Sequence, residues 1–246
     1  MNLDLSSVQV IFFDAAGTLF HVRGSVGGIY SRVAWKYGVK SEPAEVERAF
    51  VQAFHAKSAE GITPVPAGGR SQAEKHWWLE VVRQVFASSM PEPVLQAYFD
   101  EVFEVFRRAD AYLLFPETPT VLERLRRLGY RLGILSNFDS RLHDVLRGLG
   151  IESFFDTVVL SWDAGFAKPD ARLFQHALQE AGIPAALALH VGDSLSEDFQ
   201  GAAAAGMRGL LLDRKNAWPS LTNVPRIANL LEIPEMMRFS ENRVKR

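Results

Sequence analysis

The feature that most constrains the fold of this chain is the regular alternation of helix-like and strand-like segments after residue 115. Short apolar runs typical of buried strands alternate there with longer segments whose apolar residues recur at helical spacing. The expected strands are residues 130–135, 157–160, 188–191 and 209–212, and the expected helices are residues 118–128, 140–149, 171–181 and 196–205. This alternation predicts a doubly wound, mostly parallel α/β sheet with helices on both faces.

The first half of the chain has a different pattern. Residues 8–13 form one more buried-strand run, which ends at Asp14, but the segment that follows has helical periodicity and little strand signal. It predicts four helices, over residues 26–37, 43–59, 71–87 and 93–109, with a Pro- and Gly-rich loop at 61–69. We therefore expect a Rossmann-like core of residues 1–20 and 114–246, interrupted by a helical cap domain of residues 21–113.

Composition narrows the class of ligand. The 27 basic and 29 acidic residues give a net charge of −2, so we expect a small-molecule substrate and neither a nucleic-acid nor a membrane partner. The absence of cysteine excludes disulfides and thiolate chemistry and is compatible with the cytoplasm, where we expect the protein. No basic residue precedes the short first apolar run, which argues against a signal peptide or a membrane span. The oligomeric state is not predicted.

Polar clusters follow the expected strands. Because the carboxyl ends of parallel strands meet at one edge of the sheet, residues that follow different strands are brought together there. The clusters are Asp14-Ala15-Ala16-Gly17-Thr18, Ser136-Asn137, Lys168-Pro169 and Gly192-Asp193 with Asp198. A carboxylate nucleophile, a hydroxyl, a cation and a pair of acids are the groups needed to hold and attack a phosphoryl group with Mg²⁺ as cofactor.

These clusters and their order resemble the four motifs of the haloacid dehalogenase superfamily of hydrolases. The matching stretches are IFFDAAGTLF, LGILSNFD, AGFAKPDARLF and HVGDSLSEDFQGAAAAGM, and the predicted cap falls between the first two. The WWLEVV and SNFD segments are similar to the branch of that superfamily called hydrolase domain-containing protein 3. The resemblance covers essentially the whole chain.

The resemblance implies a role for each motif residue. Asp14 is then the nucleophile that forms a covalent aspartyl intermediate, and Thr18 orders the loop and borders the substrate. Ser136 and the Asn137 backbone hold phosphoryl oxygens, and Lys168 neutralises charge between Asp14 and the transferred group. Mg²⁺ is held by Asp14, the Ala16 carbonyl and Asp193, with Asp198 close by or acting through water.

One position departs from the phosphatases of this superfamily. They carry a second aspartate two residues after the nucleophile, where this chain has Ala16. That aspartate is the general acid for the leaving group and the base for the attacking water, and losing a positioned proton donor costs roughly 10² to 10⁴ in rate. Efficient phosphatase activity is therefore in question.

Three functions stay open on these residues. The first is Mg²⁺-dependent hydrolysis of a small phosphorylated or activated substrate. The second is cleavage of a carbon–halogen or carbon–phosphorus bond. Haloacid dehalogenases lack the acidic fourth motif, which Asp193 and Asp198 supply here. Phosphonoacetaldehyde hydrolases share the alanine and use a cap lysine, for which Lys36, Lys57 and Lys75 are candidates. The third is a weakly active member that binds a ligand or a partner.

Some of these residues also have purely structural interpretations. Asp14 and Ser136-Asn137, taken singly, suit turns, and Ser194 to Glu197 has capping-box spacing. His190, inside an apolar strand, is expected to be structural, and the Trp77-Trp78 pair to belong to the core of the cap.

Overall fold

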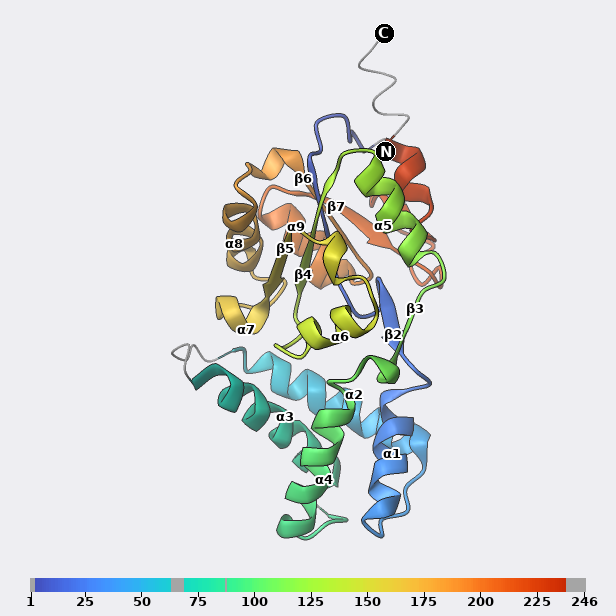
Figure 1. Ribbon diagram of the computed structural model, residues 1–246, viewed down its shortest axis with the longest axis vertical. Helices are drawn as coiled ribbons and strands as arrows, with labels where there is room; N and C mark the ends of the chain where they lie inside the picture. Colours follow the sequence, from blue (N-terminus) through green and yellow to red (C-terminus); the bar gives the residue numbers. More distant parts are fainter. Residues whose placement is uncertain (1–2, 63–68, 87, 238–246) are drawn as a thin grey trace. The chain divides into compact units, whose positions relative to one another are not determined.

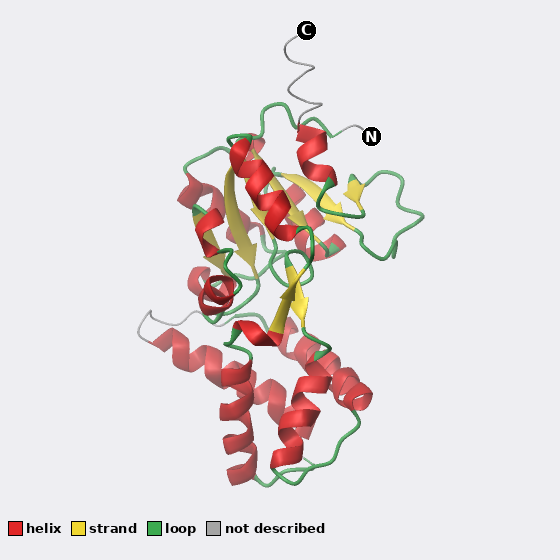
Figure 2. Cartoon of the chain, turned by 45° about the vertical axis from the view of Figure 1, so that its right-hand side comes forward, coloured by secondary structure: helices red, strands yellow, loops and turns green. Residues whose placement is uncertain are grey.

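A computed structural model describes residues 3–62, 69–86 and 88–237 (Figures 1 and 2). The chain divides into two compact units. The α/β unit comprises Met1–His21, Leu114–Phe138 and Leu149–Arg246, and the helical unit comprises Val22–Leu113 and Asp139–Gly148.

The α/β unit is built on a six-stranded sheet in the order β5-β4-β1-β6-β7-β8. Every neighbouring pair of strands runs parallel. The strands are β1 Val10–Phe13, β4 Arg131–Ser136, β5 Thr157–Leu160, β6 Ala188–Gly192, β7 Arg208–Leu212 and β8 Arg226–Ile227. The chain extends the sheet from β1 to one side and then returns to add β6 on the other, which confirms the predicted doubly wound fold and places its switch point at β1.

Strand β1 is buried along its whole length because helices cover both faces of the sheet. Successive strand residues point to opposite faces, so Val10 and Phe12 share one side. There they join a core cluster with apolar residues of helix α8 (Ala171–Ala181) and Ala202 of α9 (Gly201–Ala204). Helix α5 (Thr118–Arg127) packs on the other side (Figure 1).

The helical unit contains α1 Val26–Lys36, α2 Pro43–Ala59, α3 Arg70–Phe86 and α4 Glu92–Val105. Aromatic side chains form its centre. The Tyr30 ring lies 6.3 Å from those of Phe86 and Tyr98, and the buried Tyr98 hydroxyl donates to the Tyr30 carbonyl at 3.2 Å. None of the helices in residues 3–62, 69–86 and 88–237 combines the length and apolar character needed to cross a bilayer.

Most expected elements are present with small shifts at their ends. Most of the unexpected elements are very short: strands β2 (Phe20–Val22), β3 (Tyr112–Leu114) and β8, and helix α7 (Ser161–Ala164). Residues 232–237 are also helical and were not expected. The expected helix 196–205 is a π-helical turn, η5 (Leu195–Gln200), followed by α9. Residue 87 of the expected third helix and residues 63–68 of the expected loop lie outside the described residues.

Residues 139–148 were expected in the core domain, but they pack with the helical unit. Asp139 and Arg141 form a buried ion pair in which the guanidinium donates to both carboxylate oxygens, at 2.8 and 2.5 Å. The indole nitrogen of Trp78 donates to Asp139 at 2.6 Å, and the Arg141 guanidinium lies 4.0 Å from the centre of the Phe103 ring. Because Trp78 of α3 and Phe103 of α4 contact this ion pair, the pair attaches the segment that leads into α6 (Leu142–Gly148) to the helical unit.

Trp78→Phe is expected to destabilise the helical unit by about 1.5–3 kcal/mol. The change removes the indole donor from a buried carboxylate while keeping an aromatic ring in place, and hydrogen bonds to charged groups contribute on that scale. Urea unfolding followed by circular dichroism measures it. Trp35→Phe is the matched control, since the Trp35 side chain is 69% exposed, and a loss of equal size in the control would contradict the assignment.

Candidate active site

Asp14 follows directly after β1, where its backbone nitrogen donates to the carbonyl of Val191 in β6 at 2.9 Å. This position at the switch point of the sheet buries the residue, which is 8% exposed. Ser136, the last residue of β4, donates its hydroxyl to Oδ1 of Asp14 at 3.3 Å. The predicted nucleophile and the predicted phosphoryl-binding hydroxyl are therefore adjacent.

Lys168 lies in the same cluster and is 4% exposed. Its ammonium donates to Oδ1 of Asp14 at 2.7 Å and to Oδ1 of Asp198 at 2.6 Å. The Asn137 side chain fixes the lysine backbone, because its Oδ1 accepts from the Lys168 amide at 2.7 Å and its Nδ2 donates to the Lys168 carbonyl at 3.1 Å. Asn137 thus orients Lys168 through its side chain, and the role expected of its backbone stays a prediction.

Three carboxylates converge on this point. Asp14, Asp193 and Asp198 each offer an oxygen within 4.8 Å of the others. The approach of Asp193 depends on Gly17, whose φ is +93° and where a Cβ would come within 2.4 Å of Asp193 Oδ2. Only glycine leaves room for that carboxylate and tolerates this backbone conformation.

The charges in the cluster perturb one another. Burial raises the pKa of Asp14; Lys168 opposes this rise and Asp198 adds to it. Burial of the Asp193 carboxylate by its neighbours, together with the charges of Asp14 and Asp198, raises its pKa to about 7, although the residue as a whole is exposed. Burial also favours the neutral form of Asp198, but Lys168 and the hydrogen bond from His190 outweigh it and hold the pKa well below its usual range.

Lys168 shows the complementary effect. Burial lowers the pKa of its ammonium, but Asp14 and Asp198 outweigh burial and leave the pKa raised. The lysine therefore stays protonated at neutral pH and acts as a fixed positive charge.

The donor set fits a divalent cation. Three carboxylates against one ammonium leave two negative charges in excess when all four groups are ionised. All three candidate side-chain ligands are oxygen donors, which Mg²⁺ prefers. Asp14, Asp193 and Asp198, with the carbonyl of Ala16, are the residues that would hold it.

The loop after β1 is held in place by residues that were not predicted from the sequence. Arg214 donates to the Thr18 carbonyl at 2.9 Å and pairs with the buried carboxylate of Glu117 at 2.5 Å, and the Thr118 hydroxyl donates to the Leu19 carbonyl at 2.8 Å. Thr18 itself is fully buried, and its hydroxyl has no partner among the described residues. Its expected role in ordering the loop and binding substrate stays a prediction.

Two further site residues were not predicted from the sequence. Glu197 accepts from the Asn137 amide at 3.3 Å, and His190 contacts Asp198 at 2.9 Å. The one available signal was position, since both lie within three residues of the Gly192-Asp193 pair or of Asp198. Ser194 caps the following turn by accepting from the Glu197 amide at 3.1 Å, as its capping-box spacing indicated.

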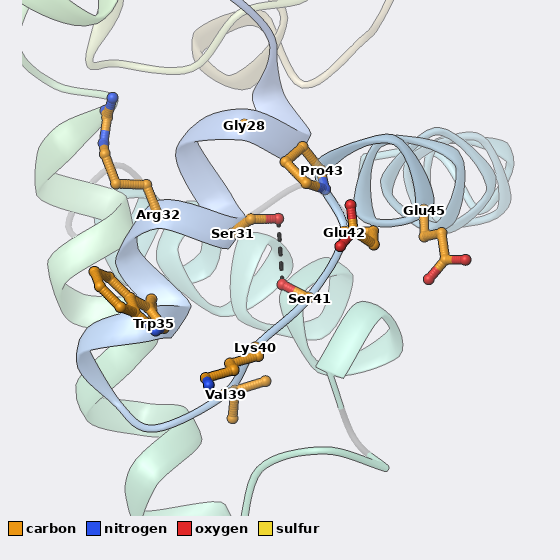
Figure 3. A pocket seen from close by; sticks show the side chains of 10 residues that line it. All are labelled: Gly28, Ser31, Arg32, Trp35, Val39, Lys40, Ser41, Glu42, Pro43 and Glu45. Carbon is orange, nitrogen blue, oxygen red and sulfur yellow. Dashed lines mark hydrogen bonds between the residues drawn. The ribbon is translucent and has the colours of Figure 1, made fainter.

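A pocket of about 470 Å³ lies wholly within the helical unit (Figure 3). Among its lining residues, the Ser41 hydroxyl donates to that of Ser31 at 3.2 Å (Figure 3). None of its lining residues belongs to the carboxylate cluster; they are Gly28, Ser31, Arg32, Trp35, Val39, Lys40, Ser41, Glu42, Pro43 and Glu45.

Comparison with known proteins gives the class to which this fold and site belong. Residues 8–206 match the family model of the haloacid dehalogenase-like hydrolases, and the chain belongs to that family. Among individual relatives, it is 34% identical to haloacid dehalogenase-like hydrolase domain-containing protein 3 of Danio rerio over 240 residues, which cover 95% of this chain and 98% of the relative. The likeness to that branch seen in the sequence is thus confirmed.

Solved structures with the same fold include a haloacid dehalogenase and a hydrolase bound to magnesium. The 2-haloacid dehalogenase of Pseudomonas syringae pv. Tomato DC3000 is 25% identical with a TM-score of 0.62, over 94% of this chain and 99% of that one. The HAD-hydrolase YfnB of Bacillus subtilis, solved bound to magnesium, is 17% identical with a TM-score of 0.71, again over 94% and 99%. The second likeness concerns the fold alone.

Proposed function

We propose that this protein is a Mg²⁺-dependent hydrolase in which Asp14 attacks a small phosphorylated or similarly activated substrate. The observation that carries the proposal is the cluster of buried Asp14, Lys168 and Asp198 with the exposed Asp193, an excess of negative charge that a divalent cation would balance. A dianionic phosphoryl group requires both the cation and the lysine.

Each residue then has a defined task. Asp14 supplies the carboxylate oxygen that attacks phosphorus, so that the bond to the leaving group breaks as an aspartyl phosphate forms. The Lys168 ammonium donates to Asp14 and balances the negative charge on the transferred group, and the Ser136 hydroxyl donates to a phosphoryl oxygen. When bound, Mg²⁺ would supply further positive charge to the phosphoryl oxygens. Water attack on phosphorus then releases phosphate and regenerates Asp14.

Ala16 sets the substrates that such a site can process. No carboxylic acid stands at this position to protonate the leaving group, and we propose that the protein acts on substrates whose leaving groups need little protonation. We further propose that the helical unit, most of which (Val22–Leu113) is inserted between the first two motif segments of the chain, acts as the cap that selects the substrate.

Dehalogenation is the second candidate, favoured by the likeness to the Pseudomonas enzyme. Asp193 and Asp198 weigh against it, since carboxylates beside the nucleophile would repel an anionic haloacid in the absence of a metal.

A lysine-dependent phosphonatase is disfavoured by the helical unit itself. Lys36 pairs with Glu101, Lys57 with Glu60 at 2.7 Å, and Lys75 with Asp100 at 2.7 Å. The side-chain nitrogen of each candidate lysine is therefore already engaged by a carboxylate of the same unit.

A substrate screen tests the proposal. Purified protein is assayed on acyl phosphates, nitrophenyl phosphate, alkyl phosphates, phosphonates and haloacids, with Mg²⁺ and with a chelator. The proposal requires phosphate release that depends on Mg²⁺. Halide release that persists in the chelator would favour the dehalogenase, and no release from any substrate would favour a binding role.

Asp193→Asn is expected to weaken Mg²⁺ binding by at least about tenfold, because affinity for hard cations depends on the charge of the oxygen ligands. Isothermal titration of the folded variant with Mg²⁺ measures the change. Asp110→Asn, a surface substitution in an exposed ion pair with Arg108, serves as the matched control. Equal affinities in wild type and Asp193→Asn would remove Asp193 from the metal site.

A further inference from the structure

His190 occupies an unusual place for an imidazole. It lies in the middle of β6, opposite Phe12 of β1 and Gly209 of β7, and is 1% exposed. The edge of the Phe174 ring packs against it, with 5.3 Å between ring centres and 87° between planes. These surroundings are apolar, as expected for a purely structural residue.

Its polar contacts do not fit that interpretation. Nε2 lies 2.9 Å from Oδ1 of Asp198, whereas the buried Nδ1 has no hydrogen-bond partner among the described residues. A carboxylate accepts but does not donate, so the hydrogen-bond network assigns the ring proton to Nε2. The other nitrogen is then a buried acceptor without a donor, which destabilises the fold. An apolar side chain of similar size would avoid that cost.

The contact with Asp198 connects His190 to the nucleophile through Lys168. Asp198 Oδ1 accepts from both His190 and Lys168, and its Oδ2 accepts from the Ser194 amide at 2.9 Å. With donors on both oxygens, the carboxylate cannot rotate about its terminal torsion. Lys168, whose four-carbon stem is flexible by nature, is thereby presented to Asp14 in one geometry.

We propose that His190 is a positioning residue, whose Nε2–H fixes the Asp198 carboxylate so that Asp198 in turn holds Lys168 on Asp14. The inference deepens the proposed function and rests on it. It accounts for a buried polar ring that packing alone does not require, and it adds a residue to the site that lies beyond contact with substrate.

Three variants test the role of the Nε2–H. His190→Leu removes the donor and keeps an apolar side chain of similar size, and His190→Gln places an amide N–H near the position of Nε2. His176→Leu, on helix α8 and outside the cluster, is the matched control. Each is assayed with nitrophenyl phosphate at saturating Mg²⁺ and unfolded thermally.

His190→Leu is expected to lower kcat by about 10- to 100-fold, the usual effect of losing an outer partner of a charged site residue. Its KM should stay within about twofold of the wild-type value, and its Tm should be no lower, since the unpartnered Nδ1 is gone. His190→Gln should recover most of the kcat. Wild-type kcat in His190→Leu overturns the proposal, and so does a loss that His190→Gln fails to recover, because the packing of the ring would then be what matters.

A readout without turnover separates this inference from the proposed function. Long-range ¹H–¹⁵N correlation spectra of the wild-type protein should show His190 as the Nε2–H tautomer, and an Nδ1–H tautomer overturns the inference whatever the activity. If the wild type releases phosphate from no substrate, the proposed function fails, while the tautomer still decides whether His190 donates to Asp198.

Discussion

Asp14→Asn is expected to abolish turnover, with a loss in kcat of at least about 10⁴-fold. Asparagine keeps the volume of the side chain and a hydrogen-bonding group beside Ser136, but its amide oxygen is not a nucleophile for phosphorus. Removing the nucleophile of an enzyme with covalent chemistry costs rate on this scale or more. Phosphate release under saturating Mg²⁺ measures it.

The fold of the Asp14→Asn variant should be retained. Lys168 keeps Asp198 as a partner at 2.6 Å, so the substitution leaves no buried charge without a counter-ion. Asp110→Asn, at an exposed position, controls for the chemical change itself. Turnover above a trace in a correctly folded Asp14→Asn protein would show that the chemistry occurs elsewhere.

Ala16→Asp is expected to raise the hydrolysis of alkyl phosphates by up to roughly 10² to 10⁴. The new carboxylic acid would protonate an alkoxide leaving group and then serve as base for the water that attacks the aspartyl intermediate. Ala16 is exposed, so an aspartate there is not forced into the core. Nitrophenyl phosphate, whose leaving group needs little protonation, should gain much less.

Ala16→Asn is the matched control for that substitution, since an asparagine side chain has almost the same shape as aspartate and carries no acidic proton. The ratio of alkyl to nitrophenyl rates should rise only in Ala16→Asp. If Ala16→Asp, correctly folded, treats both substrates as the wild type does, the absent acid is not what limits this protein, and a role in binding becomes the better interpretation.

The sequence predicts the α/β architecture well because its signals are local. Helix 171–181 and strand 157–160 match the structure at both ends, since each is bounded by turn residues, the helix has a clear period and the strand is a compact apolar run. Strands β2, β3 and β8 have two or three residues, too few for any periodicity to be visible. Their pairing depends on distant segments of the chain.

The same division between local signals and contacts of distant residues applies to the site. Its location at the ends of β1 and β4 follows from the alternation of elements, and Asp14 and Ser136 could be placed from it. The contacts that tune the site join residues far apart in sequence, such as Asn137 with Lys168 or Arg214 with Thr18, and leave no local pattern. The sequence indicated a structural role for His190 because its contact with Asp198 leaves no local pattern either.

The segment 139–148 illustrates a different limit. Its helical periodicity was recognised, but its partner was not, because the preceding and following strands both belong to the α/β unit. What decides its packing is the ion pair of Asp139 and Arg141 with the Trp78 indole, three side chains whose meeting is a product of tertiary structure.

The most direct test of the account is to look for the covalent intermediate on Asp14. Nitrophenyl phosphate should transfer its phosphoryl group readily, whereas the next step lacks a base at Ala16, so the phosphorylated enzyme should accumulate. Acid quenching during turnover with Mg²⁺, followed by mass spectrometry of the peptide that carries Asp14, measures it. We expect one phosphoryl group on Asp14, formed with a burst of nitrophenol; steady turnover with an unmodified Asp14, or with the label on another residue, would contradict the role of Asp14 as nucleophile.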